Sequence, residues 1–423
     1  MKQSHRWLLV LLFMAGCMAA GLLVARPHDP LALLPALAVL AACFSHKMPG
    51  GLRAFLVGLI LLAAVPLAGL RNTFLFELGI QVGMAATLAL GLNIVVGMAG
   101  LLDLGYAGFF AIGAYTWAIF GSPQAAAFLP AGNFPLPGWP YFYLFLGLAM
   151  LLAAGVGVLI GLPALRLRGD YLAVVTLGLG QVVRLLANNL DHPINITNGP
   201  QGITPIGRPP VDWLLRILAG LGSPVSPATG YALFFYLLVL LVAAGIVVVS
   251  RRLDRSRFGR AWVAIREDET AAQCSGVSLL KVKVLAFATG AAFSGVMGAI
   301  FAAKQLFVSP ESFTFLQSIT VLVMVLLGGM GSIRGVILGA AAVTVLNIEV
   351  LKNLSDFLNH LRQAGYVLQL GGWTYDFSRL PSQLEPAKYE RMVFGVIIVF
   401  MMIFRPGGLI PERRHRLELE EHP

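Results

Sequence analysis

The chain has 423 residues, of which 58% are hydrophobic and only 12% are charged. Soluble domains are about half apolar and about one quarter charged, so a soluble fold of this composition would expose large apolar patches. The apolar runs, such as LLVLLVAAGIVVV and VIIVFMMIF, are continuous and lack the alternation of transmembrane β-barrel strands. We therefore expect an all-α polytopic membrane protein.

The formal net charge of +10 does not indicate nucleic-acid binding, because the basic residues lie between apolar runs and form no stripe on a soluble domain. Basic residues placed in this way mark cytoplasmic loops. The 3 cysteines, Cys17, Cys43 and Cys274, are far apart and no His cluster accompanies them. This spacing argues against a metal centre and against a disulfide framework.

The first apolar stretch, 7–25, resembles both a signal peptide and a retained span, and the apolar runs that follow favour the retained span. Lys2 and Arg6 precede it and place the N-terminus in the cytoplasm. A second, short stretch at 31–45 leads back to Lys47 and Arg53 on the cytoplasmic side.

The later apolar runs continue the alternation and bring the total to about twelve spans. They lie at 54–70, 73–98, 106–120, 141–162, 171–188, 231–250, 284–303, 314–330, 335–351 and 390–404. The alternation places three segments outside, at 121–140, 189–230 and 352–389. Arginines from Arg405 onward place the C-terminus in the cytoplasm, so both termini are expected inside.

The densest basic cluster lies in the loop 251–283, on the side that the alternation makes cytoplasmic. Within it, FGRAWVAI is typical of a short amphipathic helix, and a second short helix is expected directly after it. Asp268 is suited to cap that helix, Glu269 to its first turn and Gly276 to the position after its end. A helix of about two turns is unstable alone, so it needs tertiary packing or a partner.

The pattern Ala271-Ala272-x-x-x-Gly276 resembles the EAA loop of ABC-importer permeases, in which a short helix docks into a groove on a cytoplasmic ATPase. The match is partial, because Thr270 occupies the first position. From these residues alone, a docking helix and a solvated linker both remain open.

No motif for phosphate binding, zinc-dependent proteolysis or serine hydrolysis occurs, since GxxxxGK[ST], HExxH and GxSxG are all absent from the sequence. If the protein does energised work, the energy would therefore come from an ion gradient or from a partner. A gradient-coupled carrier usually needs several carboxylates or His residues near the midplane. Glu77, which shares a helix face with Gln81, is essentially the one mid-span carboxylate here, which counts against gradient coupling.

Asp103 lies in the glycine-rich stretch VGMAGLLDLGYAGFF, where the chain is expected to break or re-enter. It is interpreted either as a helix cap or as a pathway residue, and both remain open. A second glycine-rich stretch, 326–343, lies in the other half of the chain. Interrupted helices at corresponding positions of two halves would indicate an internal repeat around a pathway, although close packing alone also explains such glycines.

Longer strings carry a family resemblance: NIVVGMAGLLDLGYAGFFAIGAYTWAIF, LRLRGDYLAVVTLGLGQVVRLLANN, FGRAWVAIREDETAAQCSGVS, FVSPESFTFLQSITVLVMVLLGGMGS and FRPGGLIP. Together they resemble the LivM permeases of high-affinity branched-chain amino acid ABC importers. The resemblance covers residues from about 54 to 411 and runs nearly without gaps over much of that range.

This resemblance implies a type II-like permease core of about ten helices at 51–411, an N-terminal membrane extension of about two helices at 1–50 and a cytoplasmic tail at 412–423. The implied partners are a LivH-like second permease, two LivG/LivF-like ATPases, a periplasmic substrate-binding protein and the bacterial inner membrane. The chain would bind no cofactor and would be no enzyme, with ATP bound by the ATPases.

The coupling residues expected on this basis are Arg260, Glu267, Asp268, Glu269, Ala271, Ala272 and Gly276. The translocation-pathway candidates are Glu77, Asn93, Asp103 and Tyr106. ATP binding would close the ATPases, and the helix at about 268–276 would transmit that motion to the spans.

The sequence departs from the family pattern in two places. The external TGGPNGI of the family stands here as TNGPQGI, with Asn198 and Gln201 substituted, and the segment 352–389 is longer than expected. Relatives also carry urea, amides or other amino acids, so these solutes remain alternatives to branched-chain amino acids. A gradient-driven carrier and a lipid-modifying membrane enzyme are the rival classes, and the enzyme would need clustered acidic or His residues at one interface, which the sequence lacks.

Overall fold

The computed structural model describes residues 55–129, 134–164, 170–220 and 226–352, two short strands, and scattered positions within 15–39 and 355–410. The α-helices of this part are α4 (Val65–Gly69), α5 (Phe74–Leu92), α6 (Tyr106–Phe120), α7 (Gly138–Ala164), α8 (Asp170–Asn189), α9 (Asp212–Gly220), α10 (Pro227–Asp254), α11 (Arg257–Glu267), α12 (Glu269–Cys274), α13 (Leu279–Gln305), α14 (Phe315–Gly328) and α15 (Ile333–Val345). Wider π-helical segments precede α4 (Leu59–Ala64) and extend α5 (Asn93–Met98) and α15 (Leu346–Leu351). Single 3₁₀ turns occupy Pro123–Ala127, Gly199–Gln201 and Pro310–Phe313.

Within the described residues, 5 helices are long and apolar enough to cross a membrane: Phe74–Met98, Gly138–Leu162, Tyr171–Asn189, Pro227–Asp254 and Leu279–Gln305. They agree with the spans expected at 73–98, 141–162, 171–188, 231–250 and 284–303, so the protein is a multi-pass helical membrane protein. The spans expected at 7–25, 31–45 and 390–404 lie largely outside the described residues.

Two of the expected spans, 106–120 and 314–330, are shorter helices that begin inside the bundle. α6 has 15 residues and α14 has 14, so each is about 22 Å long, against about 30 Å for the hydrocarbon core. The hydroxyl of Tyr106 reaches the carbonyl of Gly290 in the middle of α13, and the amide of Ala107 donates to Ser318 Oγ of α14. The two helices therefore start near one another at the centre of the bundle.

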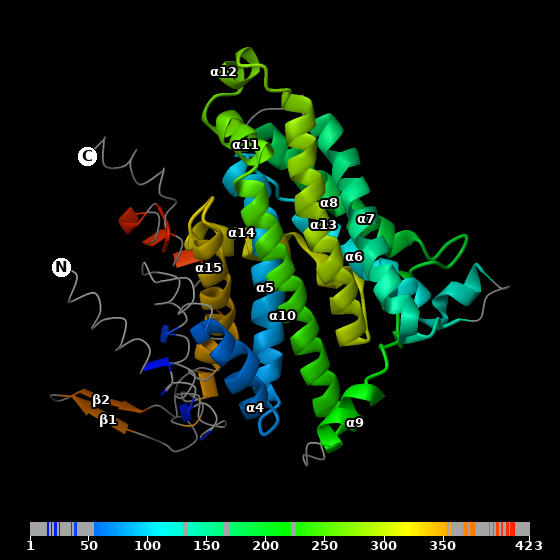
Figure 1. The fold of residues 1–423 in the computed structure, drawn as a ribbon, viewed down its shortest axis with the longest axis vertical. Helices are drawn as coiled ribbons and strands as arrows, with labels where there is room; N and C mark the ends of the chain where they lie inside the picture. The colour runs from blue at the N-terminus through cyan, green and yellow to red at the C-terminus, as the bar shows by residue number, and fades with distance from the viewer. Residues whose placement is uncertain are drawn as a thin grey trace.

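The helices pack as two interlocked halves. α6 and α7 pack on α13, α14 and α15 pack on α5, and α5 and α13 pack on each other. α5 begins at the end of the bundle that carries α4, whereas α13 begins at the opposite end, below α12 (Figure 1). The sets α5–α7 and α13–α15 thus run in opposite directions, which is the arrangement of an inverted repeat.

The position of the chain breaks corrects one expectation from the sequence. The break between α5 and α6 (99–105) corresponds to the break between α13 and α14 (306–314), because each joins the first two helices of its half. The glycine-rich stretch 326–343 instead contains the turn between α14 and α15. The sequence is rich in glycine at both the α5–α6 break and the stretch 326–343. Glycine content alone does not show which chain breaks are equivalent in the two halves, because glycines serve close packing as well as chain reversal.

Glycines set the contact between α6 and α13. A Cβ atom on Gly113 would overlap the backbone of Gly295, and one on Gly298 would overlap the backbone of Phe110. The two backbones therefore approach as closely as small residues allow, which is the usual packing solution for helices in lipid.

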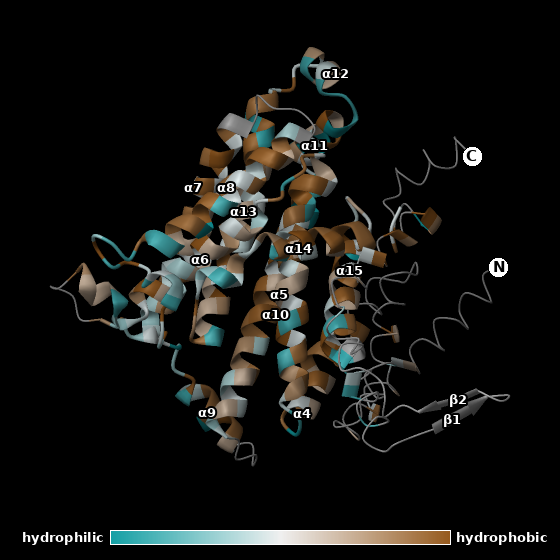
Figure 2. Cartoon of the chain, turned by 180° about the vertical axis from the view of Figure 1, so that it is seen from behind, coloured by the Kyte–Doolittle hydropathy of each residue, from teal (hydrophilic) through white to brown (hydrophobic). Residues whose placement is uncertain are grey.

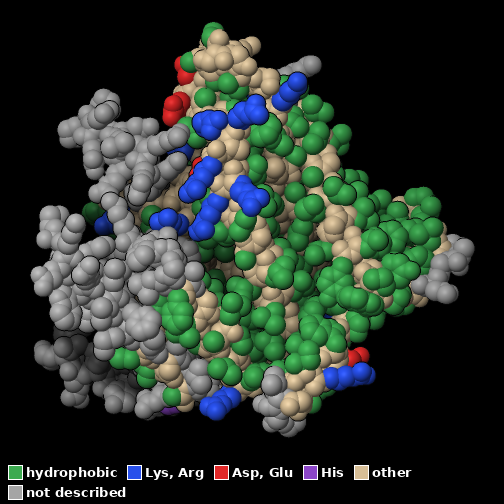
Figure 3. All heavy atoms as spheres, viewed as in Figure 1, with side chains coloured by type: hydrophobic (Ala, Val, Ile, Leu, Met, Phe, Trp, Pro, Cys, Tyr) green, Lys and Arg blue, Asp and Glu red, His purple; other side chains and the backbone are tan. Residues whose placement is uncertain are grey.

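One end of the bundle carries a cluster of basic residues. Figure 3 shows Lys and Arg side chains gathered where α10 ends and α11 begins, beside a broad hydrophobic area over the helices below. The exposed arginines of this region are Arg251, Arg252, Arg255, Arg257 and Arg260. Hydrophobic residues predominate along the middle of the long helices, while polar residues gather near α11 and α12 (Figure 2). The end that carries α11 and α12 is therefore the basic end.

A small hairpin stands apart from the helices. β1 (Val367–Leu370) pairs antiparallel with β2 (Trp373–Asp376), with Val367 opposite Asp376 and Leu370 opposite Trp373. It falls within the long segment 352–389. The membrane-spanning bundle itself is all-α.

Candidate functional site

The basic loop folds into two short helices at the end of the bundle. Ser256 caps α11, since its hydroxyl accepts hydrogen bonds from the amides of Phe258 (3.1 Å) and Gly259 (3.3 Å). Trp262 and Ile265 lie on the buried face of this helix, which is the face that the pattern FGRAWVAI predicts to be apolar. The expected amphipathic helix is confirmed.

The local structure of α12 also agrees with its sequence. Asp268 caps the helix, and its Oδ1 accepts hydrogen bonds from the amides of Thr270 (2.7 Å) and Ala271 (3.0 Å). Glu269 lies in the first turn. Gly276 follows the last turn with a φ of 84°, a left-handed conformation that glycine adopts without strain. At 6 residues the helix is too short to be stable alone, so its position depends on tertiary contacts.

Those contacts join the two helices to α13. The indole Nε1 of Trp262 donates to the carbonyl of Val282 at 2.8 Å, and Lys283 Nζ lies 2.5 Å from Glu269 Oε1. The Lys283 side chain is 4% exposed and that of Glu269 is 25% exposed, so this ion pair is well shielded from water. In the sequence, Lys283 is one of many basic residues of this loop. No local pattern links it to Glu269, so the sequence does not predict this ion pair.

The predicted coupling residues divide between two faces of the loop. Arg260, Glu267, Ala271 and Gly276 are exposed, and nothing lies within 4 Å of the position that a Cβ on Gly276 would take. Ala272 is only 4% exposed and packs inward, so its methyl group is not available to a partner. The two alanines of the predicted pattern therefore face in different directions, and the docking role of this loop stays a prediction. The different directions follow from helix geometry, because consecutive residues point about 100° apart.

Three of the pathway candidates lie together in the interior. Asn93 and Tyr106 are each 1% exposed, and the hydroxyl of Tyr106 donates to the carbonyl of Gly290 at 3.1 Å. Asn93 Oδ1 accepts a hydrogen bond from the amide of Gly331 at 2.9 Å, which joins the end of α5 to the turn between α14 and α15. These side chains hold the centre of the bundle together in this conformation.

Asp103 is the third buried candidate and stabilises the chain just before α6. Its Oδ1 accepts from the amide of Gly105 at 2.9 Å, while the neighbouring amide of Leu104 donates to Thr176 Oγ1 of α8 at 3.1 Å. The side chain is 1% exposed, and its Oδ2 has no hydrogen-bond partner among the described residues. The geometry is that of a short turn from Asp103 to Gly105, beside the contact between Leu104 and α8, and no side chain caps α6 itself.

Glu77 does not join this cluster. It lies in the first turn of α5, 16 positions before Asn93 and so about 24 Å away along the helix. Its Oε2 lies 2.5 Å from Lys304 Nζ in the last turn of α13, and Arg208 donates to the Lys304 carbonyl. This ion pair fastens α5 to α13 at the end of the bundle opposite α12.

We expect Glu77→Gln to be mild. The Glu77 side chain is 45% exposed, so water reaches the pair even though the Lys304 side chain is 11% exposed, and a pair screened in this way contributes about 1 kcal/mol or less. The free energy of unfolding should fall by about that amount or less, and transport should be retained. Thermal unfolding of the purified protein, with uptake assays beside it, checks both. Abolished uptake in a folded variant would contradict this structural role.

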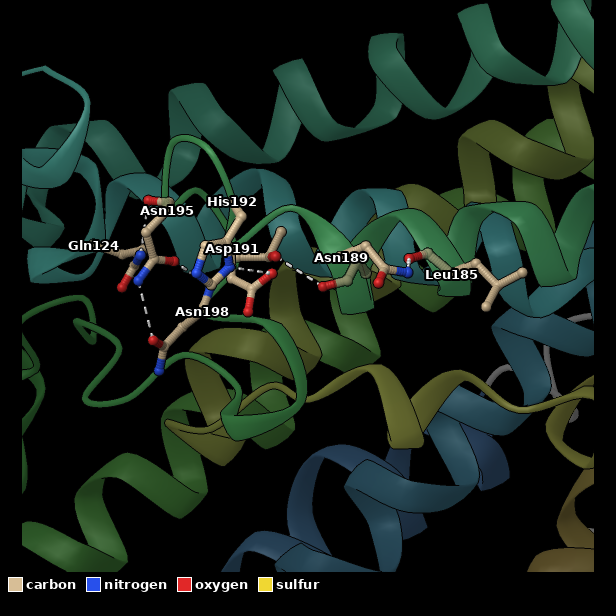
Figure 4. A network of polar contacts seen from close by, with 9 residues as sticks. Gln124, Leu185, Asn189, Asp191, His192, Asn195 and Asn198 are labelled. Carbon is tan, nitrogen blue, oxygen red and sulfur yellow. Dashed lines mark hydrogen bonds and ion pairs between the residues drawn. The ribbon is translucent and has the colours of Figure 1, made fainter.

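The two expected external loops contact one another at that same end. Gln124 Nε2 donates to the carbonyl of Asn195 at 2.9 Å, and the amide of Asn198 donates to Asn195 Oδ1 at 2.8 Å. Figure 4 shows Gln124, Asn195 and Asn198 close to one another in this network. The loops at 121–140 and 189–230 therefore lie on one side of the bundle.

This geometry accounts for one of the departures from the family pattern. Asn198 has a φ of 59°, and its Nδ2 donates to the carbonyl of Gly202 at 2.8 Å. Asn is among the few residues besides glycine that adopt such a φ readily, so both the glycine of the family pattern and the Asn found here are compatible with this turn. Gln201 is exposed.

We expect Asn198→Gly to be mildly destabilising and Asn198→Val to be more damaging. Glycine keeps the conformation and loses side-chain hydrogen bonds, at a cost of about 1 kcal/mol. Valine is strained there and should cost about 1–3 kcal/mol. Unfolding midpoints of the purified variants give the comparison. Equal midpoints for the Val and Gly variants would contradict it.

Among the described residues, no group of three or more His, Cys, Asp or Glu side chains could hold a metal ion. What the described part does contain is a bundle of membrane-spanning helices in two inverted halves, with a helical loop fixed to its basic end. These features define a membrane permease. The relation to known proteins makes the assignment specific.

Residues 74–402 match the family described as branched-chain amino acid transport system / permease component. The chain therefore belongs to this family of permease components.

Three relatives illustrate the similarity. The high-affinity branched-chain amino acid transport system permease protein LivM of Escherichia coli K12 is 39% identical over 378 residues, covering 86% of this chain and 76% of the relative. The Salmonella typhimurium protein of the same description is 38% identical over 344 residues, covering 79% and 69%. A probable branched-chain amino acid transport permease protein LivM of Methanocaldococcus jannaschii is 27% identical over 280 residues, covering 66% and 71%. No solved structure matches the chain.

Proposed function

We propose that this chain is the transmembrane permease subunit of an ATP-driven importer of branched-chain amino acids. The observation that carries the proposal is the pair α11–α12, which presents exposed small residues at the basic end and is fixed to α13 by Trp262 and Lys283. A short helix held in this way suits a surface on which a partner's movement is converted into movement of the spans.

The energy for this movement comes from partner subunits. The sequence has no phosphate-binding loop of its own, so nucleotide must be bound elsewhere. We infer a complex with a LivH-like second permease, two LivG/LivF-like ATPases and a periplasmic substrate-binding protein. This chain binds no cofactor and catalyses no reaction in that complex.

The orientation follows from charge. The arginines at the end of α10 and along α11 favour the cytoplasm, so we infer that the ATPases bind at α12 and that the joined loops 121–140 and 189–230 lie in the periplasm. Both termini are then cytoplasmic in the bacterial inner membrane. The permease unit comprises 51–411, preceded by a membrane extension at 1–50 and followed by a tail at 412–423.

The solute is inferred from the relatives named for branched-chain amino acids. We expect apolar walls along the pathway to suit aliphatic side chains. The binding protein is expected to set most of the specificity. Asn198 adopts the left-handed conformation that glycine also takes, so this substitution alone gives no reason to prefer urea or amides as solutes.

Two measurements on the complex test this function. First, affinity purification of the tagged chain after co-expression with its neighbouring genes should recover both ATPases and the second permease. Second, uptake of labelled leucine should be competed by excess isoleucine or valine and not by urea. Purification without ATPases would contradict the ATP-driven mechanism, and competition by urea alone would contradict the solute.

A further inference from the structure

Arg266, in the last turn of α11, reaches away from the loop and into the bundle. Its Nη1 donates to the carbonyl oxygen of Gly97 at 2.6 Å. Its side chain also lies against Gly100, which has a φ of 69°, and a Cβ there would come within 2.9 Å of Arg266 Cγ. The glycines of the α5–α6 break thus leave room for this arginine.

The carbonyl that Arg266 contacts belongs to the end of a helix. Gly97 lies in the π-helical segment Asn93–Met98, after which the chain leaves the helix at Ala99. The last carbonyls of a helix lack partners within it and carry the negative end of the helix dipole. A guanidinium group is therefore a favourable partner at this position, and it ties α11 to the end of α5.

One further contact connects the same place to the second half of the molecule. Asn93, one turn before Gly97, accepts a hydrogen bond from the amide of Gly331 in the turn between α14 and α15. A Cβ on Gly97 would overlap both Asn93 Oδ1 and the amide of Gly331. Arg266, Gly97, Asn93 and Gly331 therefore form one continuous set of contacts from the basic end to the interior.

We propose that Arg266 is a positioning residue, which holds the α5–α6 break and the α14–α15 turn in register with α12. The proposal rests on the proposed function, because it assumes that ATPases move α12. α11 contacts α13 through Trp262 and α5 through Arg266, so a rotation of α11 acts on both central helices of the inverted repeat. The end of α5 and the turn at Gly331 are the elements whose position would differ between the outward and inward states.

The test compares Arg266→Gln, Arg266→Lys and the control Arg252→Gln in the complete complex reconstituted in proteoliposomes. Arg252 is an exposed arginine in the last turn of α10, so the control makes the same charge change without touching α5. Coupling between sites typically corresponds to about 5- to 150-fold effects, so for Arg266→Gln we expect uptake per ATP hydrolysed to fall about tenfold. The ATPases should remain bound. Lys keeps a charged donor, so Arg266→Lys should lie between Gln and the unchanged protein.

Unchanged uptake per ATP in Arg266→Gln, equal losses in the Gln and Lys variants, or a matching loss in Arg252→Gln would overturn the proposal. Release of the ATPases by Arg266→Gln would overturn it too, because Arg266 would then be a docking residue.

Amide hydrogen exchange of the same variants separates this proposal from the proposed function. Arg266→Gln should speed exchange at 97–101 and 329–332, and Arg252→Gln should not. Unchanged exchange at both places would overturn the positioning role. If the proposed function were wrong, uptake would need no ATP in any variant, while this exchange difference would remain.

Discussion

Replacing Ala271 with Glu, or Gly276 with Asp, is expected to release the ATPase subunits from this chain. Ala271 is exposed, so a Glu side chain fits there in the isolated chain, and a side chain on Gly276 meets nothing within 4 Å, although the φ of 84° strains any residue other than glycine. In a docked complex the new carboxylate would be buried without a partner, at a cost of about 3–5 kcal/mol. Binding should weaken about a hundredfold or more, as measured by titrating purified ATPase onto the permease.

Two control variants isolate the effect of docking. Gly276→Ala carries the same strain at a φ of 84° without the charge, and it should retain most of the binding. Ala219→Glu adds a carboxylate at an exposed position of α9, at the opposite end of the bundle, and should leave ATPase binding unchanged. If all four variants bound the ATPases equally, α12 would not be the docking helix.

Breaking the pair of Glu269 and Lys283 is expected to have the second large effect. Glu269→Gln removes the carboxylate that Lys283 contacts, and the Lys283 side chain is only 4% exposed. Leaving a buried charge without its partner costs about 3 kcal/mol or more, and some of this is relieved here because Glu269 is partly in contact with water. The unfolding midpoint of the permease should fall, and proteolysis should increase within 255–277.

A double variant shows whether the pair or the individual side chains matter. Glu269→Gln combined with Lys283→Met leaves no buried charge and should recover much of the stability lost in Glu269→Gln. A double-mutant cycle on unfolding midpoints gives the coupling between the two side chains. Purely additive losses would show that the ion pair does not hold α12 in place.

The features that the sequence predicted well are local ones. The cap at Asp268, the glycine after α12 and the apolar face of α11 each depend on a few neighbouring residues. The long spans are equally clear, because bilayer thickness fixes their length and composition. The membrane class and the loop structure therefore needed no three-dimensional information.

The features that the sequence missed depend on contacts between distant segments. Lys283 and Glu269, Arg266 and Gly97, and Asn93 and Gly331 are joined by the fold, and no periodicity links them. The inward position of Ala272 depends on how α12 is laid against the bundle. The sequence predicted full membrane spans at the short helices α6 and α14, because an apolar composition does not show where a helix begins within a membrane.

The interior candidates show the same division. Asn93, Asp103 and Tyr106 stood out as polar residues in an apolar sequence, and they lie at the centre where the two halves meet. Each contacts the backbone at a chain break or a neighbouring helix. Whether they also line an open pathway depends on a conformation in which these contacts are exchanged, so their role in translocation remains a prediction.

The most direct test of the central claim is leucine uptake by proteoliposomes that contain the full complex, with ATP in the lumen and the binding protein outside. We predict uptake that requires ATP, both ATPases and the binding protein, and that is lost in Ala271→Glu. Uptake by this chain alone, driven by an imposed proton or sodium gradient without ATP, would contradict the account.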